Sequence, residues 1–332
     1  MTSYGYIVST FRVRRRYKKG EPLELGAFDG YSDALHQIYG LLMGLTDTGF
    51  TETKSARHLK ITSTNPIGRM IKFTAHVGNS GQTSQIFESD RDPSPIFDRR
   101  NHHIESSPRR GLILGAAQAN GGLILLEVQG RSGMKTLLES ALTKGFQHYH
   151  PEFILDVARI SDEAALKKYL DAAALQHVIL RRSSIPRDVA DVYEFSPQVA
   201  DSGKLELKIT PTGTIRGIID DLVRKFNTPQ RNQMLEIGNI HFDDIKIAMQ
   251  SGNRKVTMNI TSESIPTFVY DLEHDSDPPT NEEFYTQTLD AIQEVSRALG
   301  LRLAPGWSEG DWSDDVLKLV LEQPTENGHG QG

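Results

Sequence analysis

One stretch, Gly111 to Leu142, constrains the fold most, because it combines two apolar runs with an amphipathic segment. The runs Leu112–Leu114 and Leu123–Val128 are nearly continuous in apolar residues, which is typical of strands covered on both faces. Asn120-Gly121 lies between them, and this dipeptide favours a tight hairpin turn because it accepts positive φ angles. The stretch therefore predicts a buried β-hairpin.

A helix is expected directly after this hairpin. Ser132 is suited to the N-cap position. Apolar residues then repeat with helical spacing at Met134, Leu137, Leu138, Ala141 and Leu142. We expect the hairpin and this helix to form the centre of an α+β fold with mixed or antiparallel sheets and packed helices.

Strands and helices are also expected on both sides of this centre. Strand patterns occur at residues 4–13, 58–64, 69–77, 83–88, 153–158, 175–180, 205–209, 244–249, 255–260 and 265–272. Helix patterns occur at residues 32–45, 162–170, 213–226 and 281–299, with a short helix after Ile185-Pro186. We predict a basic N-terminal α+β domain over residues 1–150, a second α+β region over 151–300 and an acidic tail over 301–332. Trp307, Trp312 and Val316–Leu321 are too apolar for pure disorder, so this tail is expected to dock on the body or on a second subunit.

The charge of the chain is distributed unevenly along its 332 residues, although the net value is only −6. Residues 1–136 hold 18 Lys and Arg against 12 Asp and Glu, whereas residues 271–332 hold 3 against 14. This asymmetry indicates a polyanion-facing front and an acidic, solvating or partner-facing end. The chain has no cysteine, which excludes disulfides and thiolate metal sites, and it shows no secretory signal or apolar membrane-spanning run. We therefore expect a cytoplasmic protein.

The densest basic cluster follows the first predicted strand. It comprises Arg12, Arg14, Arg15, Arg16, Lys18 and Lys19, with Tyr17 among them. Such a cluster can neutralise phosphates while the aromatic ring stacks on a base. The alternative is a solvated strand end without a binding role.

Residues 90–110 form a second basic region of different character. They contain three prolines and the pairs Arg99-Arg100 and Arg109-Arg110, but no apolar periodicity. We predict a loop of about 20 residues, longer than compact domains usually contain. This loop is either a mobile basic clamp or a surface insertion. His102-His103 lacks further ligands at metal-binding spacing, so no metal site is expected.

Two further sites are weaker candidates for an anion. Arg131 and Lys135 flank the strand-to-helix turn after Gln129, where free N–H groups of a helix N-terminus can hold a phosphate. A plain turn that binds nothing is the alternative. Arg181 and Arg182 end a predicted strand and add a second basic pair.

The sequence contains no recognisable catalytic motif. The patterns GxxxxGK[ST], GxGxxG, GxSxG and HExxH are all absent from it. Glu127 and Asp156 on predicted strands suggest a metal-dependent nuclease, but the partner lysine that this chemistry uses has no position at the expected spacing. We expect a non-enzymatic protein without a cofactor, with the nuclease kept as an alternative.

The order of segments resembles the RexA family of phage-exclusion proteins, and KwaB of the Kiwa defence system is similar in architecture. The resemblance covers roughly residues 59–299 and is carried by GLILGAAQANGGLILLEVQGRSGMKTLLESAL, by LELKITPTGTIRGIIDDLVRKF and by SIPTFVYDLEH before the acidic helix. It implies a cytoplasmic DNA-binding homodimer that senses phage replication and signals to a membrane protein encoded nearby. The loop at 90–110 and the acidic tail depart from the family pattern.

These observations together favour a largely sequence-independent binder of double-stranded DNA in antiphage defence. The basic residues named above would contact phosphates, and the acidic segment after Leu299 would compete with DNA for them. The alternatives are the nuclease and a protein-interaction module whose basic regions meet an acidic partner.

Overall fold

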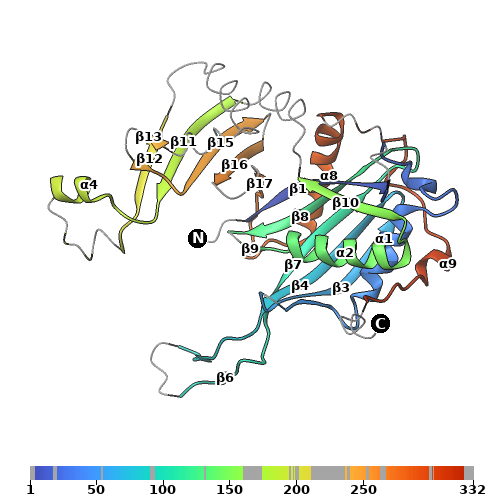
Figure 1. Cartoon of the computed structure of the whole chain (residues 1–332), viewed down its shortest axis with the longest axis horizontal. Helices are drawn as coiled ribbons and strands as arrows, with labels where there is room; N and C mark the ends of the chain where they lie inside the picture. The colour runs from blue at the N-terminus through green and yellow to red at the C-terminus, as the bar shows by residue number, and fades with distance from the viewer. Residues whose placement is uncertain are drawn as a thin grey trace. The chain divides into compact units, whose positions relative to one another are not determined.

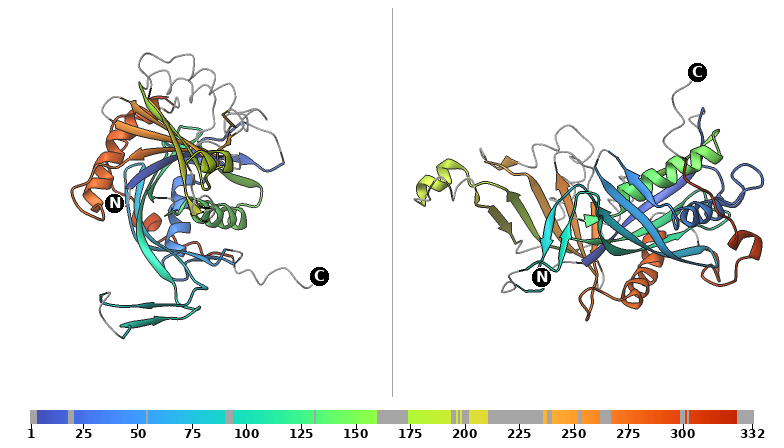
Figure 2. Two further views of the ribbon diagram at one scale, coloured as in Figure 1. Left: turned by 90° about the vertical axis from the view of Figure 1, so that its left-hand side faces the viewer. Right: turned by 90° about the horizontal axis from the view of Figure 1, so that it is seen from below.

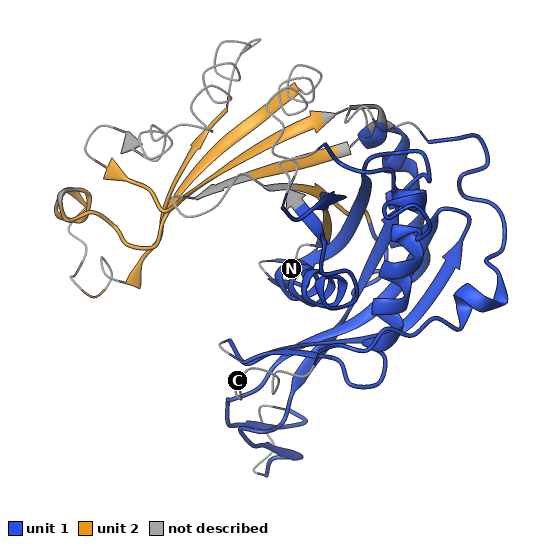
Figure 3. Cartoon of the chain, turned by 45° about the vertical axis from the view of Figure 1, so that its right-hand side comes forward, with its two compact units in different colours: residues 1–4, 9–158, 274–332 blue, residues 5–8, 159–273 orange. Residues whose placement is uncertain are grey.

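The computed structural model describes residues 4–324 except 18–20, 54, 90–93, 131, 160–173, 194–195, 197, 199–201, 211–235, 238–239, 252–253, 262–266, 299–300 and 302. Helices occur together with extensive antiparallel sheet, which confirms the predicted α+β class. The chain divides into two compact units (Figure 3). Unit 1 comprises residues 1–4, 9–158 and 274–332, and unit 2 comprises residues 5–8 and 159–273. Among the described residues, no helix is long and apolar enough to cross a membrane.

Unit 1 is built on a sheet in the order β1–β8–β7–β4–β3–β2, with β10 beside β1 and β9 beside β8. Its strands are β1 (Tyr4–Arg15), β2 (Phe50–Glu52), β3 (Arg57–Ile67), β4 (Met70–Asn79), β7 (Glu105–Leu114), β8 (Gly122–Gln129), β9 (Ser132–Gly133) and β10 (Phe153–Arg159). A separate two-stranded ribbon is formed by β5 (Ser84–Ile86) and β6 (Phe97–Arg99). Strand β1 is shared, since its residues 5–8 belong to unit 2.

Helices cover both faces of this sheet (Figure 2). Helices α1 (Ala34–Gly44) and α2 (Lys135–Tyr149) pack on one face, and α8 (Asn281–Ala298) packs on the other against β7 and β8. Helix α1 begins where expected, because the carboxylate of Asp33 accepts hydrogen bonds from the backbone N–H groups of Leu35 and His36. Two short helical turns, η1 (Leu25–Ala27) and α9 (Asp314–Leu317), complete the unit.

Strands β7 and β8 pair antiparallel, with Gly111 opposite Leu126 and Leu114 opposite Leu123. Residues from Arg109 to Leu114 and from Gly122 to Glu127 are all buried, so the prediction that both faces are covered is confirmed. The prediction of an Asn120-Gly121 tight turn is wrong. Neither residue has a positive φ, and seven residues, 115–121, connect the strands. This connection instead accepts backbone hydrogen bonds from Leu25 and Gly26, at Ala119 and Ala117 respectively.

The tail docks on unit 1. This is the first of the two arrangements expected for it, on the body or on a second subunit. The backbone N–H of Leu321 donates to Gly40 O at 2.9 Å, and Trp312 Nε1 donates to Gly68 O at 2.7 Å. A Cβ on Gly44 would lie only 2.0 Å from Leu321 O, so this glycine lets the tail approach helix α1 closely. The tail lies along α1 and the β3–β4 turn and also reaches α2, where the Tyr149 hydroxyl donates to Glu322 O at 3.2 Å.

Unit 2 is an antiparallel sheet in the order β12–β11–β15–β16–β17, and residues 5–7 of β1 pair with β17. Its strands are β11 (Ala174–Arg182), β12 (Leu205–Ile209), β15 (Asp244–Ser251), β16 (Arg254–Thr261) and β17 (Thr267–Asp271). The short pair β13 (Glu236–Ile237) and β14 (Ile240–His241) and helix α4 (Arg187–Val192) also belong to it. Its core includes Ile245, Ile247, Met249, Val256 and Met258.

Several predictions about organisation differ from the structure. The predicted boundaries at 150 and 300 are replaced by a unit 1 that includes helix α8 and the tail. Ser132 is not the N-cap of α2; it pairs with Gln129 in β9, and the cap residue is Met134. The helices predicted at 162–170 and 213–226 lie outside the described residues.

Candidate functional site

The basic cluster lies where β1 ends in unit 1 (Figure 1). Phe11 and Val13 are buried and alternate with Arg12 and Arg14, so strand alternation turns this pair of arginines away from the core. Arg12 is exposed. Arg15 and Arg16 continue the segment and are exposed as well, and Tyr17 is 85% exposed. Lys18 and Lys19 lie outside the described residues. We call residues 12–17 the basic segment.

An aromatic cluster supports the basic segment from beneath. The guanidinium of Arg15 lies 5.3 Å from the centroid of the Phe153 ring, a cation–π contact. The Phe153 ring meets the Phe28 ring edge-on at 5.2 Å, and Phe28 in turn packs against Phe146 and His150. Burial lowers the pKa of His150, which favours the neutral imidazole in this cluster, and the charge of Asp29 opposes the shift. The guanidinium of Arg15 is therefore held in place by packed aromatic side chains.

Helix α2 lies beside the basic segment and contacts it at Arg16. The amide oxygen of Gln147, in the orientation that satisfies both of its polar atoms, accepts hydrogen bonds from Arg16 Nη2 and Nη1 at 2.7 and 2.9 Å. Lys144 and His148 are exposed on the same helix, three residues before and one residue after Gln147. Sequence reasoning missed this contribution of α2, although the predicted helical period places Lys144 and Gln147 on one face.

Arg14 has a carboxylate neighbour. Its Nε lies 4.0 Å from Asp156 on β10, and both side chains are more than a third exposed. An ion pair this exposed contributes about 0–1 kcal/mol, so it competes only weakly with another anion. Among the described residues, no ion pair is formed by Arg12, Arg15 or Arg16.

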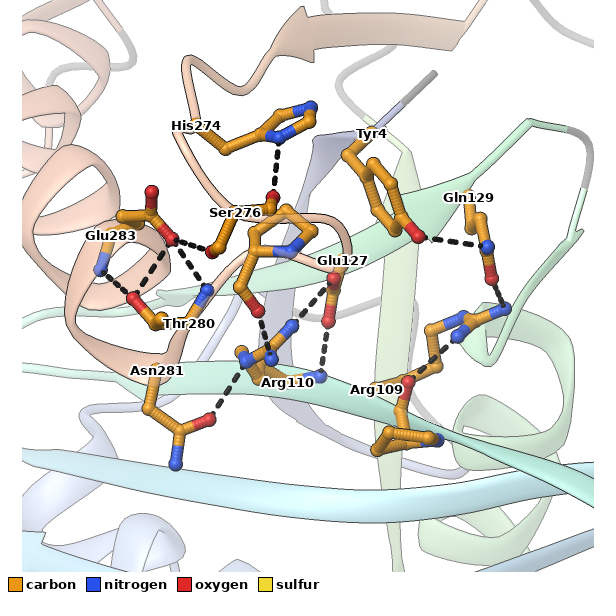
Figure 4. Close-up of polar contacts among 12 residues, drawn as sticks. Tyr4, Arg109, Arg110, Glu127, Gln129, His274, Ser276, Thr280, Asn281 and Glu283 are labelled. Carbon is orange, nitrogen blue, oxygen red and sulfur yellow. Dashed lines mark hydrogen bonds and ion pairs between the residues drawn. The ribbon is translucent and has the colours of Figure 1, made fainter. Parts of the chain in front are cut away.

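The second predicted cluster, Arg109-Arg110, is buried instead of exposed (Figure 4). Arg110 lies in β7, where its Nη1 donates to Glu127 Oε1 at 2.7 Å and its backbone N–H donates to Glu127 Oε2 at 2.9 Å. Its Nε donates to Asn281 at the start of α8, and its Nη2 donates to Pro279 O. Arg110 thus joins β8 to the segment that leads into α8.

Arg109 lies beside Arg110, and its partners extend the cluster of buried polar side chains from Arg110 and Glu127 to Gln129 and Tyr4. Its Nη2 donates to Gln129 Oε1 at 2.6 Å, and Gln129 Nε2 donates to the hydroxyl of Tyr4 at 3.1 Å. Burial lowers the pKa of Arg109, an effect opposed by the charge of Glu127. The ladder between β7 and β8 stops at Gly111 and Leu126. The cluster therefore fills the place where these two strands separate.

The mobile-clamp interpretation of residues 90–110 is wrong for the residues that the structure describes. Arg99 is 6% exposed and forms an ion pair with Glu105, and its Nη2 donates to Asn79 O at 2.8 Å. Arg109 and Arg110 belong to the sheet. Only Arg100 of the four arginines remains exposed. Buried, hydrogen-bonded guanidinium groups cannot contact a phosphate without breaking the sheet.

The weaker candidates are also engaged in local contacts. Lys135 lies 3.4 Å from Glu139 on α2, and Arg181 lies 2.7 Å from Glu206 on the neighbouring strand. Arg182 donates to Ser184 Oγ and to His241 O. Arg131 lies outside the described residues. None of these contacts joins Lys135, Arg181 or Arg182 to the basic segment.

Glu127, which the nuclease interpretation uses as a metal ligand, already has hydrogen-bond partners within the fold. This carboxylate is 1% exposed and both of its oxygens accept hydrogen bonds from Arg110. A metal ligand needs lone pairs directed at the ion, whereas Oε1 accepts from the guanidinium and Oε2 from the backbone N–H of Arg110. Among the described residues, no group of three His, Asp or Glu side chains is placed to hold a metal ion.

Comparison with known proteins adds no assignment for this geometry. No protein-family model matches the chain, and no curated protein matches its sequence.

Proposed function

We propose that the chain binds the sugar-phosphate backbone of double-stranded DNA through the basic segment, without cutting it. The observation that carries the proposal is the exposure of Arg12, Arg15 and Arg16, of which Arg15 lies over the Phe153 ring and Arg16 is bound by Gln147. Each of these side chains offers a full positive charge that the described residues do not neutralise with a carboxylate. Sequence-independent binding of this kind depends on such phosphate contacts.

The basic segment also has the geometry that such binding requires. Arg16 is held by Gln147 of α2 and by Pro151 O, so its guanidinium is positioned instead of freely rotating. Pre-positioned cations lose less conformational entropy on binding than free ones. Tyr17 adds an exposed ring beside Arg16, whose guanidinium lies 6.0 Å from its centroid.

The resemblance to the RexA family extends this proposal to a biological role. In that role the protein acts in the cytoplasm as a homodimeric sensor in antiphage defence, and it signals to a membrane-protein effector encoded nearby. The test is phage plating on cells that carry the gene with its neighbours. Plating that does not change when the gene is deleted would contradict the role and leave DNA binding untouched.

Two charge-matched triple variants test DNA binding itself. Arg12→Ala, Arg15→Ala and Arg16→Ala together remove three positive charges from the basic segment. Lys204→Ala, Lys208→Ala and Lys255→Ala together remove the same charge from exposed positions of unit 2. Fluorescence anisotropy with a random duplex should show a loss of about tenfold or more for the first variant, since each phosphate contact contributes separately. An equal loss for both variants would mean that net charge, not this segment, determines binding.

A further inference from the structure

An apolar arm projects from unit 1 at the end of the β4–β7 hairpin. Strands β4 and β7 pair as far as Asn79 and Glu105, and the chain between them forms the ribbon of β5 and β6 (Figure 1). The base of the arm is fixed, because Arg99 bridges Glu105 and Asn79 O. Beyond this point, the described strands β5 and β6 of the arm pair with each other.

The arm exposes an unusual amount of apolar surface for a two-stranded ribbon. Five large side chains are 42% to 65% exposed, namely Ile86, Phe87, Ile96, Phe97 and Ile104. Ile86 and Phe97 are directly opposite each other in the ladder and share one face, whereas Phe87 and Ile96 follow the alternation to the other face. Both faces of the ribbon are therefore apolar, which is typical of a surface that is covered in an assembly.

The ribbon also lacks the partners that a stable sheet needs. Among the described residues, β5 and β6 pair only with each other, so both of their outer edges are open. A two-stranded hairpin is marginally stable in water, and a third or fourth strand with a shared apolar face stabilises it. Open edges beside exposed Phe and Ile side chains are a template for pairing with another chain.

The charges on the arm identify the kind of partner. The exposed charged residues described on it include Glu88 and Asp98, which are negative, and Arg100, which is positive. Two carboxylates beside the apolar side chains repel nucleic acid and anionic lipid. A second copy of the same arm carries both signs, and the two-fold symmetry of such a contact allows Arg100 of each copy to face the carboxylates of the other.

The area of the arm is compatible with this partner. The five side chains, two of them aromatic, are about half exposed and offer on the order of 400 Å² of apolar surface per arm, divided between its two faces. Two arms that meet through one face each then cover roughly 400 Å² of apolar surface, and pairing along an open strand edge adds main-chain contacts to it.

We propose that the β5–β6 arm is a self-association surface, on which the arm of a second copy of this chain packs through Ile86, Phe87, Ile96 and Phe97. This inference rests on the homodimer of the proposed function, for which it names the contact surface, but not on DNA binding, because the arm and the basic segment share no residue.

The oligomeric state of the full chain tests the proposal. Sedimentation of the wild type should show a dimer, and the double variant Phe87→Ser with Phe97→Ser should weaken it about a hundredfold, since buried aromatic anchors dominate interface energies. Tyr31→Ser is the matched control, because Tyr31 is 95% exposed outside the arm. A wild type that stays monomeric, or a dimer that the double variant leaves unchanged, would overturn the proposal.

A cross-linking experiment keeps the test valid if the double variant misfolds. The chain contains no cysteine, so a single Ser84→Cys gives one reactive thiol on the arm. A short bifunctional maleimide should join two Ser84→Cys chains and should not join two Tyr31→Cys chains. Equal cross-linking of both, or of neither, would overturn the proposal, as would binding of the wild type to anionic vesicles that the double variant loses.

Discussion

Burial, more than residue type, decides what each arginine of this chain does. Arg110 and Arg16 are the same residue in equally basic stretches, yet Arg110 is bound to Glu127 inside the sheet and Arg16 faces solvent beside Gln147. The sequence shows the positive charge of both. It does not show that Glu127, seventeen residues later, is opposite Arg110. The exposed basic segment was therefore predictable, whereas the buried pair was not.

The buried Arg110–Glu127 ion pair should contribute strongly to the stability of unit 1. Glu127→Gln leaves the Arg110 charge buried without its counter-ion, and breaking such a pair costs about 3–5 kcal/mol. Urea unfolding should show a loss of this size. Glu139→Gln removes the partner of Lys135 from a partly exposed position on α2, so the same substitution there should cost about 0.5 kcal/mol or less. Similar losses in the two variants would show that the buried pair contributes no more than a surface pair.

Among the elements, those with regular patterns were predicted well. Strands β3 and β4 alternate along their length, and β15 and β16 lie at the expected strand patterns 244–249 and 255–260, so their predicted positions are confirmed. The prediction failed for β6 and the first half of β7. These segments have no apolar alternation, because Arg99 and Arg109 are buried by ion pairing and hydrogen bonding instead of by hydrophobic contact. A pattern of apolar residues cannot detect that kind of burial.

The N-terminus of helix α8 is stabilised by reciprocal hydrogen bonds between Thr280 and Glu283. Its N-terminus has a capping box, in which Glu283 Oε2 accepts from the backbone N–H of Thr280 at 2.6 Å and Thr280 Oγ1 accepts from the N–H of Glu283. A further hydrogen bond comes from Ser276 Oγ (Figure 4), and the N–H of Asp275 donates to Glu283 Oε1. Together these bonds lower the pKa of Glu283 from 4.5 to about 2.

This shift sets the direction of a pH effect. Because the folded pKa lies below the unfolded value, the ionised carboxylate stabilises the fold above about pH 4.5, and this stabilisation is lost as the pH falls toward 2. Thermal unfolding followed across that window should therefore be less acid-sensitive in Glu283→Gln than in the wild type. Glu282→Gln, at the adjacent position, should keep the wild-type profile. Indistinguishable profiles for the two variants would contradict the capping role.

At the scale of the whole molecule, contacts distant in sequence replace the predicted order of domains. The acidic helix α8 belongs to unit 1 because Arg110 bonds to Pro279 and Asn281, about 170 residues further along the chain. The tail also belongs to unit 1, and its described contacts are with α1, with the β3–β4 turn and with the C-terminal part of α2, where the Tyr149 hydroxyl donates to Glu322 O. The contact between Tyr149 and Glu322 lies two residues after Gln147, which binds Arg16, and the expected competition between the acidic segment and DNA stays a prediction. No local pattern in the sequence indicates either of these long-range contacts.

The salt dependence of DNA binding tests the central claim most directly. The affinity of the wild type for a random duplex should fall steeply with salt, with a log–log slope of about −0.9 for each phosphate contacted. Removing Arg12, Arg15 and Arg16 together should make this slope shallower by about 2.7, while the charge-matched triple variant of unit 2 should keep the wild-type slope. A wild-type affinity that hardly changes with salt, or a slope that the basic-segment variant leaves unaltered, would contradict binding of the DNA backbone by this segment.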